Sequence, residues 1–327
     1  MNFLKALTTS ILTLALLLAL LWQLDWQQIS AVLGQTDPLF FLMAILLTCF
    51  SYCIHAMRWK LFFSGPGTEM HIIFKTVVIG HLFNALLPSK AGEIIRPIFL
   101  KRTSGIAYTN ILATCLVERI FDGVLVLGCL GLGAAFLGKE IVGSLTAACI
   151  ILGLYFLIAS ILIALYWHQE RIQTFSANIL NKKIHQKLES IIAELSLGTR
   201  RLNKLKSLRV LAYTIVYCSL NVAAVWCALR SINLQSDLQT LKVSLLLVGT
   251  LGISLALPSP PANMGVFHFT VYSVLVFASG EDFTSNTSFI SAAIVIHLAA
   301  LIPDLLVGGL SYFSFPKRLR ELPVKAS

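Results

Sequence analysis

The sequence predicts an all-α integral membrane protein that crosses the bilayer several times. Its 327 residues are 57% hydrophobic and only 12% charged, with a mean hydropathy of +0.83. Soluble proteins carry roughly 25% charged residues. The apolar residues are grouped in blocks of about 18 or more, the length at which a helix spans a bilayer. This composition excludes a water-soluble enzyme, a disordered protein and a nucleic-acid-binding domain, and no nucleic-acid partner is expected.

Nine hydrophobic blocks follow one another along residues 1–327, which we expect to form a single membrane domain. They cover residues 4–22, 38–57, 71–88, 106–137, 141–166, 210–230, 238–257, 264–280 and 287–313. No small-residue cleavage site follows the first block, so we expect it to be a retained helix rather than a signal peptide.

Basic residues set the predicted orientation in the cytoplasmic (inner) membrane. The formal net charge is +10, from 25 Lys and Arg against 15 Asp and Glu. Short loops rich in Lys and Arg stay on the cytoplasmic side. The loop after 4–22 contains Asp25 and Asp37 and no basic residue, whereas Arg58 and Lys60 follow block 38–57. We therefore place both termini in the cytoplasm, with nineteen of the 25 basic residues, Arg58 among them, on that face.

Two segments are predicted to enter the membrane and return. If block 71–88 crossed fully, the basic residues after it would lie outside, against the charge rule. The sequence from Leu87 to Glu93, LPSKAGE, instead predicts a turn, and so a re-entrant hairpin over 71–100. A second hairpin is expected over 238–280, entered from the other side. Broken helices at membrane depth need cover from protein or water, so both turns are candidate sites.

With these hairpins, six blocks remain as full transmembrane helices and the chain contains an inverted repeat. Its halves cover about 38–137 and 210–313, and the two turns begin with the same letters, LPS, at Leu87 and Leu257. Broken helices at matching places in two halves are typical of a transporter site near the midplane. The alternative is that two unrelated Pro-containing loops look alike. Residues 168–206 form a basic segment, predicted to be either an amphipathic helix on the anionic leaflet or a solvated elbow.

Charged residues interrupt the apolar stretches at several positions. They are Lys90, Glu93, Arg96, Glu118, Arg119, Asp122 and Asp304. Each costs a few kcal/mol at the bilayer centre, so such residues face a cavity or a partner. One interpretation is an internal salt-bridge network that holds helices together. The other is a polar chamber for a charged headgroup, in which Arg supplies the bidentate fork suited to phosphate.

The motifs around the first turn resemble a known family. Asn84, Pro88-Ser89-Lys90-Ala91-Gly92-Glu93 and Arg96, followed by Glu118-Arg119 and Asp122, are similar to the signature of the flippase-like membrane region of lysylphosphatidylglycerol synthases. The stretch from Pro258 to His268 resembles the C-terminal motif of that family. Here Pro260-Pro261-Ala262-Asn263 replaces a Gly-rich run, and His268 stands near the position of a family Glu.

The resemblance implies a lipid flippase that translocates an anionic phospholipid or another lipid-linked headgroup, so the expected partners are membrane lipids. Lys90 and Arg96 would hold phosphate. The gate or proton-coupled network would comprise Glu93, Glu118, Arg119 and Asp122, with Asn84 on the first half and Asp304 and His268 on the second. Two alternatives stay open: an intramembrane enzyme with Glu93 or Glu118 as general base, and a non-transporting partner of an envelope-lipid synthesis enzyme.

Cysteine and histidine patterns predict no metal site, and no cofactor is expected. All seven cysteines fall in apolar blocks, and no Cys or His pair has metal-ligand spacing. Four histidines are embedded in these blocks, at positions 55, 81, 268 and 297. For each of them, an interhelical hydrogen bond and a role in proton relay are both open.

Overall fold

This computed structural model describes residues 27, 34–88, 90–137, 204–232, 237–255, 259–280 and 287–316, most of which are helical. Within these ranges no β-strand occurs, and the predicted all-α class is confirmed. Several predicted features lie outside the described residues: the blocks 4–22 and 141–166, most of the segment 168–206, and the turn residues Ser89, Leu257 and Pro258.

Most helix boundaries agree with the hydrophobic blocks to within three residues, but α10 begins six residues before block 210–230, and α5 lies between two blocks as the second arm of the predicted hairpin. The helices are α3 (Pro38–Lys60), α4 (Met70–Leu86), α5 (Gly92–Ser104), α6 (Tyr108–Leu137), α10 (Lys204–Arg230), α11 (Asp237–Ser254), α12 (Val266–Ser279) and α13 (Thr287–Ser314). A 3-10 helix, η2 (Pro261–Asn263), precedes α12. Four described segments are long and apolar enough to cross a membrane, namely 38–60, 205–230, 261–279 and 288–314. The protein is thus an all-helical, multi-pass membrane protein, while the number of crossings stays a prediction.

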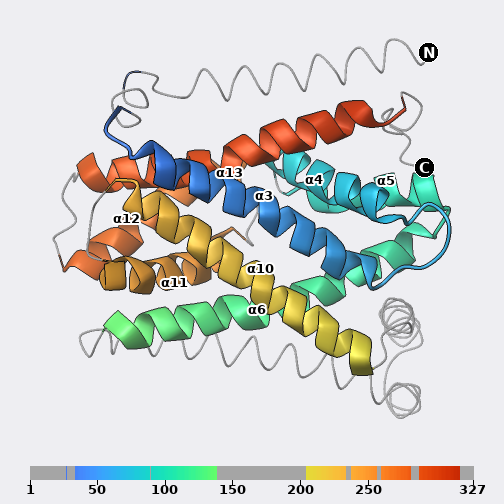
Figure 1. The fold of residues 1–327 in the computed structure, drawn as a ribbon, viewed down its shortest axis with the longest axis horizontal. Coiled ribbons are helices and arrows are strands. Elements are labelled where there is room, and N and C mark those ends of the chain that lie inside the picture. Colours follow the sequence, from blue (N-terminus) through green and yellow to red (C-terminus); the bar gives the residue numbers. More distant parts are fainter. Residues whose placement is uncertain are drawn as a thin grey trace, which may run out of the picture.

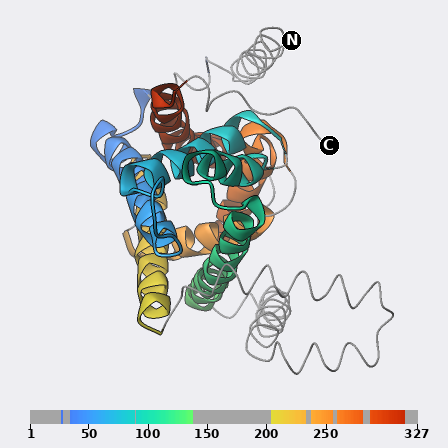
Figure 2. The ribbon, with the colours of Figure 1, turned by 90° about the vertical axis from the view of Figure 1, so that its right-hand side faces the viewer.

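The long helices run roughly along one axis (Figure 1) and surround a common centre when seen end-on (Figure 2). Helix α3 packs on α10, α6 on α11, and α13 on α4. The start of α3 is held by Asp37, whose carboxylate accepts from the Leu39 N–H at 2.8 Å. The Asp37 N–H also donates to the Ser231 carbonyl at 2.7 Å, which ties this end of α3 to the end of α10.

Helices α4 and α5 form a tight hairpin. A Cβ added to Gly92 would lie 1.9 Å from the carbonyl oxygen of Gly80, a distance no real side chain tolerates. The backbones therefore approach closely because neither residue has a side chain, as small residues permit in membrane proteins. Helix α5 ends at Gly105, which adopts the left-handed conformation (φ 69°). The hairpin itself is observed, and its re-entrant position in the bilayer stays a prediction.

Two apolar cores occupy different levels of the bundle. One contains Val117 of α6 and Val210 of α10. The other contains Leu127 of the same α6 and Cys227 of the same α10. The segment of each helix between the two cores therefore lies near the middle of the bundle, and in α6 this segment contains Glu118, Arg119 and Asp122.

Candidate functional site

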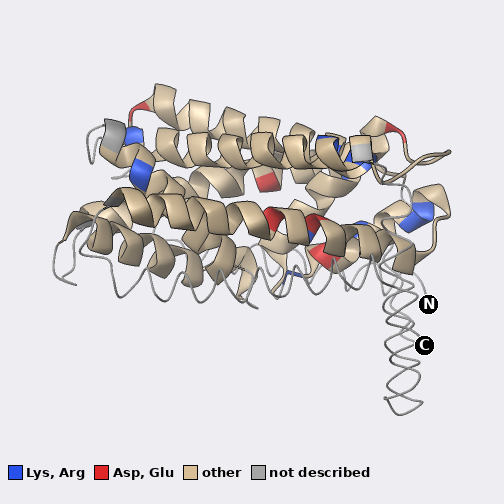
Figure 3. Ribbon diagram, turned by 90° about the horizontal axis from the view of Figure 1, so that it is seen from below, with Lys and Arg blue, Asp and Glu red and all other residues tan. Residues whose placement is uncertain are grey.

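Charged side chains from several helices gather between the two apolar cores. Acidic positions appear part-way along the helices in Figure 3, away from the ends where charges normally lie. On α6 these positions are Glu118 and Asp122, one turn apart and hence on one face of the helix. This level of the bundle is the candidate site.

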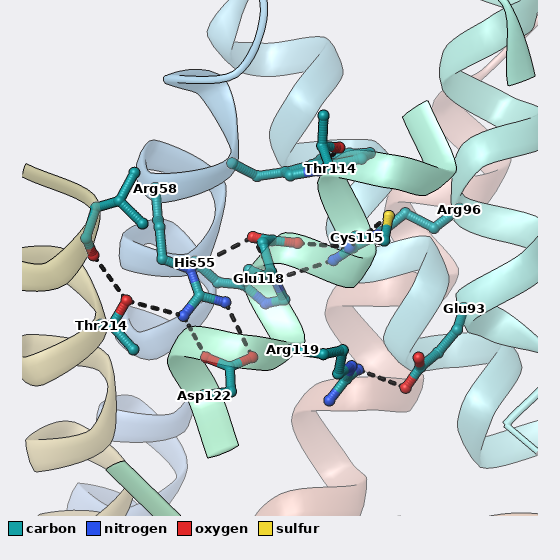
Figure 4. Close-up of polar contacts among 12 residues, drawn as sticks. His55, Arg58, Glu93, Arg96, Thr114, Cys115, Glu118, Arg119, Asp122 and Thr214 are labelled. Carbon is teal, nitrogen blue, oxygen red and sulfur yellow. Dashed lines mark hydrogen bonds and ion pairs between the residues drawn. The ribbon is translucent and has the colours of Figure 1, made fainter. Parts of the chain in front are cut away.

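The centre of the site is a network of two guanidinium groups and two carboxylates (Figure 4). Arg96 Nη2 donates to Glu118 Oε2 at 2.6 Å, and Arg58 Nε donates to Glu118 Oε1 at 3.3 Å. Arg58 also donates to the Asp122 carboxylate through both terminal nitrogens, and the distance from Nη2 to Oδ2 is 3.2 Å. Arg58 Nη1 further donates to the Thr214 hydroxyl on α10 at 3.3 Å. The network therefore joins α3, α5, α6 and α10.

The network is buried and its formal charges cancel. Arg58 is 0% exposed and Glu118 is 2% exposed. Two cations face two anions, which is how proteins tolerate buried charge. Arg96 gains further contacts from the Trp59 ring, whose centroid lies 4.2 Å from its guanidinium carbon, and from the Cys115 sulfur at 3.0 Å. Its Nε is buried without a hydrogen-bond partner.

Arg58, expected in a basic loop after block 38–57, instead lies in the last turn of α3, and its side chain is buried in the bundle. The structure buries this side chain and pairs it with two carboxylates more than 50 positions along the chain. The reason is that Arg58 occupies the last turn of α3 and turns inward against α6 and α10. A signal was present in the sequence: Ser51, His55 and Arg58 follow the helical spacing of four and three, and so form one polar face.

A second, more accessible ion pair lies beside the first helical turn of α5. Arg119 follows Glu118 on α6 but points to a different face, where it is 52% exposed and pairs with Glu93, which is 33% exposed. Lys90 precedes Glu93 and is half-buried in the turn. The structure thus divides the predicted residues into a buried pair (Arg96, Glu118), a partly exposed Asp122 (20%) that joins them through Arg58, and an accessible set (Lys90, Glu93, Arg119).

Asp304 lies on α13 and binds residues of the first half. Its Oδ1 accepts a hydrogen bond from the Tyr52 hydroxyl on α3 and lies 3.7 Å from Nδ1 of His81 on α4. Sequence reasoning missed Tyr52. Asn84 also lies on α4, where its side-chain oxygen is buried without a partner next to Gly92.

His268 belongs to a separate pair with His297. Nε2 of His297 donates to the Ala262 carbonyl at 2.9 Å, so its Nδ1 accepts, at 3.3 Å, from Nε2 of His268. These tautomers are assigned from the partners, since a carbonyl only accepts. The pair thereby holds the turn before α12, where Ser259 also donates to the Asn263 side chain at 2.6 Å.

Backbone strain is concentrated at the two turns. Among the described residues, the non-glycine residues with positive φ are Lys90 (53°), Ala262 (52°) and Asn263 (56°). Such conformations cost about 1–3 kcal/mol each and cluster at functional sites. The two turns also approach each other, because Ala262 packs in one buried cluster with Ala85 of α4.

The family model described as the lysylphosphatidylglycerol synthase transmembrane region matches residues 6–308. The chain belongs to this family. The resemblance noted from the first motif is thereby confirmed. Membership makes the protein a multi-pass membrane protein of lipid-related processes.

Two curated relatives share parts of the chain. The UPF0104 membrane protein PH1989 of Pyrococcus horikoshii is 34% identical over 93 residues, 27% of this chain and 28% of that protein. The glycosyltransferase AglD of Haloferax volcanii is 26% identical over 123 residues, 37% of this chain and 20% of that protein. The alignment therefore spans less than a third of either relative.

In this family member, the described residues contain no group of three His, Cys, Asp or Glu side chains placed to hold a metal ion. The cysteines of the described helices are free thiols. The side chains that the structure brings together at the site carry guanidinium, ammonium, carboxylate and imidazole groups, which bind anions and transfer protons.

Proposed function

We propose that the protein carries the anionic headgroup of a membrane lipid across the bilayer while the acyl tails remain in the lipid. The observation that supports this proposal is the graded arrangement of cations from Lys90 and Arg119 inward to Arg96. The accessible set has two cations and one carboxylate, Glu93, so it attracts an anion from the membrane surface. Behind it, Arg96 supplies a second guanidinium at the depth of the bundle centre.

A phosphate group competes with the carboxylates for these cations. Arginine forms bidentate, charge-assisted hydrogen bonds with phosphate and carboxylate alike. A headgroup phosphate can therefore displace Glu93 from Arg119 first, and Glu118 from Arg96 next. The residual pairing of Arg58 with Asp122 keeps the remaining helices together during this exchange.

An apolar cavity beside the network offers a place for part of a lipid tail. Its volume is about 480 Å³, and its lining comes from α6, α10 and α11, including Leu125, Leu132, Ile215 and Trp226. Leu125 follows Asp122 by less than one turn of α6. A lipid with its headgroup at the network would thus find apolar surface for its tail nearby.

In this proposal the two strained turns, from opposite membrane faces, form the inner walls of the chamber. The halves 38–137 and 210–313 rock against each other in alternating access, with both termini in the cytoplasm. Accessibility of a cysteine placed at Lys90 tests the orientation: labelling only from the external side would contradict it.

Transport is tested in liposomes that contain fluorescent phosphatidylglycerol, phosphatidylcholine or a neutral glycolipid. We expect the protein to accelerate exchange of the anionic lipid above empty liposomes and above the other two lipids. Each charge-assisted hydrogen bond is worth about 1.5–3 kcal/mol, so Lys90→Ala and Arg119→Ala should each slow exchange about tenfold or more. Lys101→Ala removes an exposed cation of α5 and serves as the matched control, with unchanged exchange. Equal rates in protein-containing and empty liposomes would refute the proposal.

A catalytic role for Glu118 receives no support from its surroundings. Two guanidinium groups occupy both of its oxygens, so the carboxylate is poorly placed to take a proton from a substrate. Chromatography of the recovered lipids distinguishes the two ideas. A transporter leaves the labelled lipid chemically unchanged, whereas an intramembrane enzyme produces a new compound. The partner hypothesis instead predicts that Arg96→Ala leaves function intact.

A further inference from the structure

We infer that Glu118, His55, His81 and Asp304 form a proton relay that Arg96 holds closed until an anionic headgroup draws it away. The inference rests on the proposed function and names how transport would be coupled to protons. The four groups come from α6, α3, α4 and α13, so the relay connects the buried network with the second half of the chain.

Consecutive groups of the relay lie 3.4–3.7 Å apart, at or just beyond hydrogen-bond range. Glu118 Oε1 lies 3.5 Å from Nε2 of His55. Nδ1 of His55 lies 3.4 Å from Nε2 of His81. The last step, from Nδ1 of His81 to Asp304 Oδ1, is 3.7 Å, and it must shorten by about 0.5 Å to become a hydrogen bond.

Arg96 determines the direction of every hydrogen atom in the row. Its Nη1 lies 2.9 Å from Nε2 of His55, and because arginine only donates, this nitrogen must be the acceptor. The proton of neutral His55 therefore resides on Nδ1 and is donated to Nε2 of His81. The proton of His81 consequently resides on its own Nδ1 and points toward the carboxylate of Asp304.

The ring of His81 is held in this orientation by its neighbours. It stacks on Tyr52 with the centroids 4.6 Å apart, and it meets the His55 ring edge-on at 5.6 Å. The Tyr52 hydroxyl donates to the same oxygen of Asp304 that His81 faces. One aromatic residue thus orients both the last donor and the final acceptor.

Proton transfer along the row balances at each atom. The O–H bond of a protonated Glu118 breaks as an N–H bond forms at Nε2 of His55. The Nδ1–H bond of His55 breaks as one forms at Nε2 of His81, and the Nδ1–H bond of His81 breaks as one forms at Asp304. Each imidazole gains one proton and loses one, and the net result moves a proton from α6 to α13.

Arg96 prevents the first step in two ways. It occupies the lone pair of Nε2 on His55, and it pairs with Glu118 so that the carboxylate stays ionised. When a headgroup phosphate draws the guanidinium away, Glu118 loses a cation and can take a proton from water. The same movement frees Nε2 of His55, so headgroup binding opens the relay.

Several titratable or charged groups face the relay. They are Cys49, Tyr52 and Arg58 from α3, Lys90 from the turn before α5, Arg96 from α5, Cys115 and Arg119 from α6, and Tyr217 from α10. Arg58 and Arg96 act on His55, and Lys90, Arg96 and Arg119 act on His81, whereas Asp304 is the anion at the far end of the relay.

The second histidine pair provides a contrast. Its donor chain runs from His268 through His297 and ends on the Ala262 carbonyl, which cannot take up a proton. The first pair ends on a carboxylate, which can. Proton transfer is therefore assigned to His55 and His81 alone among the described histidine pairs.

Proton flux is measured in liposomes with an entrapped pH dye, an imposed pH gradient, and valinomycin with potassium to collapse the membrane potential. Exchange of fluorescent phosphatidylglycerol is followed in parallel samples. We expect the protein to dissipate the gradient in phosphatidylglycerol vesicles and to conduct few protons in phosphatidylcholine vesicles, because the choline ammonium neutralises the headgroup phosphate that would otherwise draw Arg96 away. Glutamine cannot pass protons on, so His81→Gln and His55→Gln should each lower the flux by about a hundredfold. His71→Gln, an exposed change on the same helix as His81, is the matched control with wild-type flux.

Arg96→Gln tests the closing role directly. We expect this variant to conduct protons in phosphatidylcholine vesicles as well, because the lone pair of His55 is no longer occupied. Size-exclusion chromatography identifies variants that fail to fold. If Arg96→Gln does not fold, the histidine variants still test the relay, because they remove no charge pair. Lipid exchange without proton flux, or full flux in His81→Gln, would overturn the relay and leave the proposed function standing. Headgroup-dependent proton flux without lipid exchange would support the relay and refute the proposed transport function.

Discussion

Glu118→Gln removes the carboxylate that Arg58 and Arg96 share. At 3.3 and 2.6 Å, the two attractions are worth about 5 and about 6 kcal/mol with an effective dielectric constant of about 20. Glutamine keeps the shape but not the charge, so the buried network is left with two cations and one anion. Breaking a buried pair costs about 3–5 kcal/mol, because the remaining charge stays away from water.

Chemical denaturation in mixed micelles, followed by tryptophan fluorescence, measures this loss in the free energy of unfolding. Glu93→Gln is the matched control, since it makes the same change in a partly exposed pair, where about 0–1 kcal/mol is expected. The double variant Glu118→Gln/Arg96→Gln should lose less than the sum of its single changes, because the two residues share one interaction. Equal, small losses for Glu118→Gln and Glu93→Gln would refute the closed, buried network.

Three further predictions concern the scaffold. Asp37→Ala should destabilise the protein by about 1 kcal/mol through loss of the α3 N-cap. Asp37→Asn should retain most of the wild-type stability, because Asn also caps helices; thermal unfolding measures both variants. Gly92→Ala should cost about 1–3 kcal/mol or prevent folding, whereas Gly128→Ala, which meets no neighbouring atom, should be neutral or stabilising; a similar effect of both would contradict the close hairpin. Hydrogen bonds from backbone N–H groups, its own and that of Gly67, lower the pKa of Glu69 in the loop before α4. Because the folded pKa is lowered, the hydrogen bond is present above the ordinary carboxyl pKa and is lost as pH falls through the lowered value. The protection of the Gly67 amide from hydrogen exchange should therefore decline at acidic pH in the wild type and show no such pH dependence in Glu69→Gln.

Helix positions could be predicted from the sequence because hydropathy is a local property. The blocks 38–57 and 287–313 became α3 and α13 with boundaries shifted by at most three residues. The turn around Lys90 was also predictable, since Pro and Gly break helices wherever they are placed in this way. The inverted repeat and the placement of the chain relative to the bilayer stay predictions.

The partners within the site could be predicted only in part. That Arg96, Glu118 and Asp122 face inward follows from the cost of charge in lipid. The burial of Arg58 was missed because a basic residue at the end of an apolar block has the same local pattern whether it faces water or the bundle. Its pairing with Glu118 and Asp122 depends on α3 lying beside α6, a long-range arrangement that no local pattern encodes.

The sequence by itself determined the class of protein, the helical segments and the list of charges that require an explanation. Tertiary structure alone decided which charges neutralise one another, which remain accessible, and which histidines face a carboxylate. The physical reason is that the free-energy cost of burying a charge can be recognised from a single residue, whereas the interaction that offsets this cost requires a partner residue. Hydropathy therefore reveals where compensation is needed, and only the packing of α3, α4, α5, α6 and α13 shows what provides it.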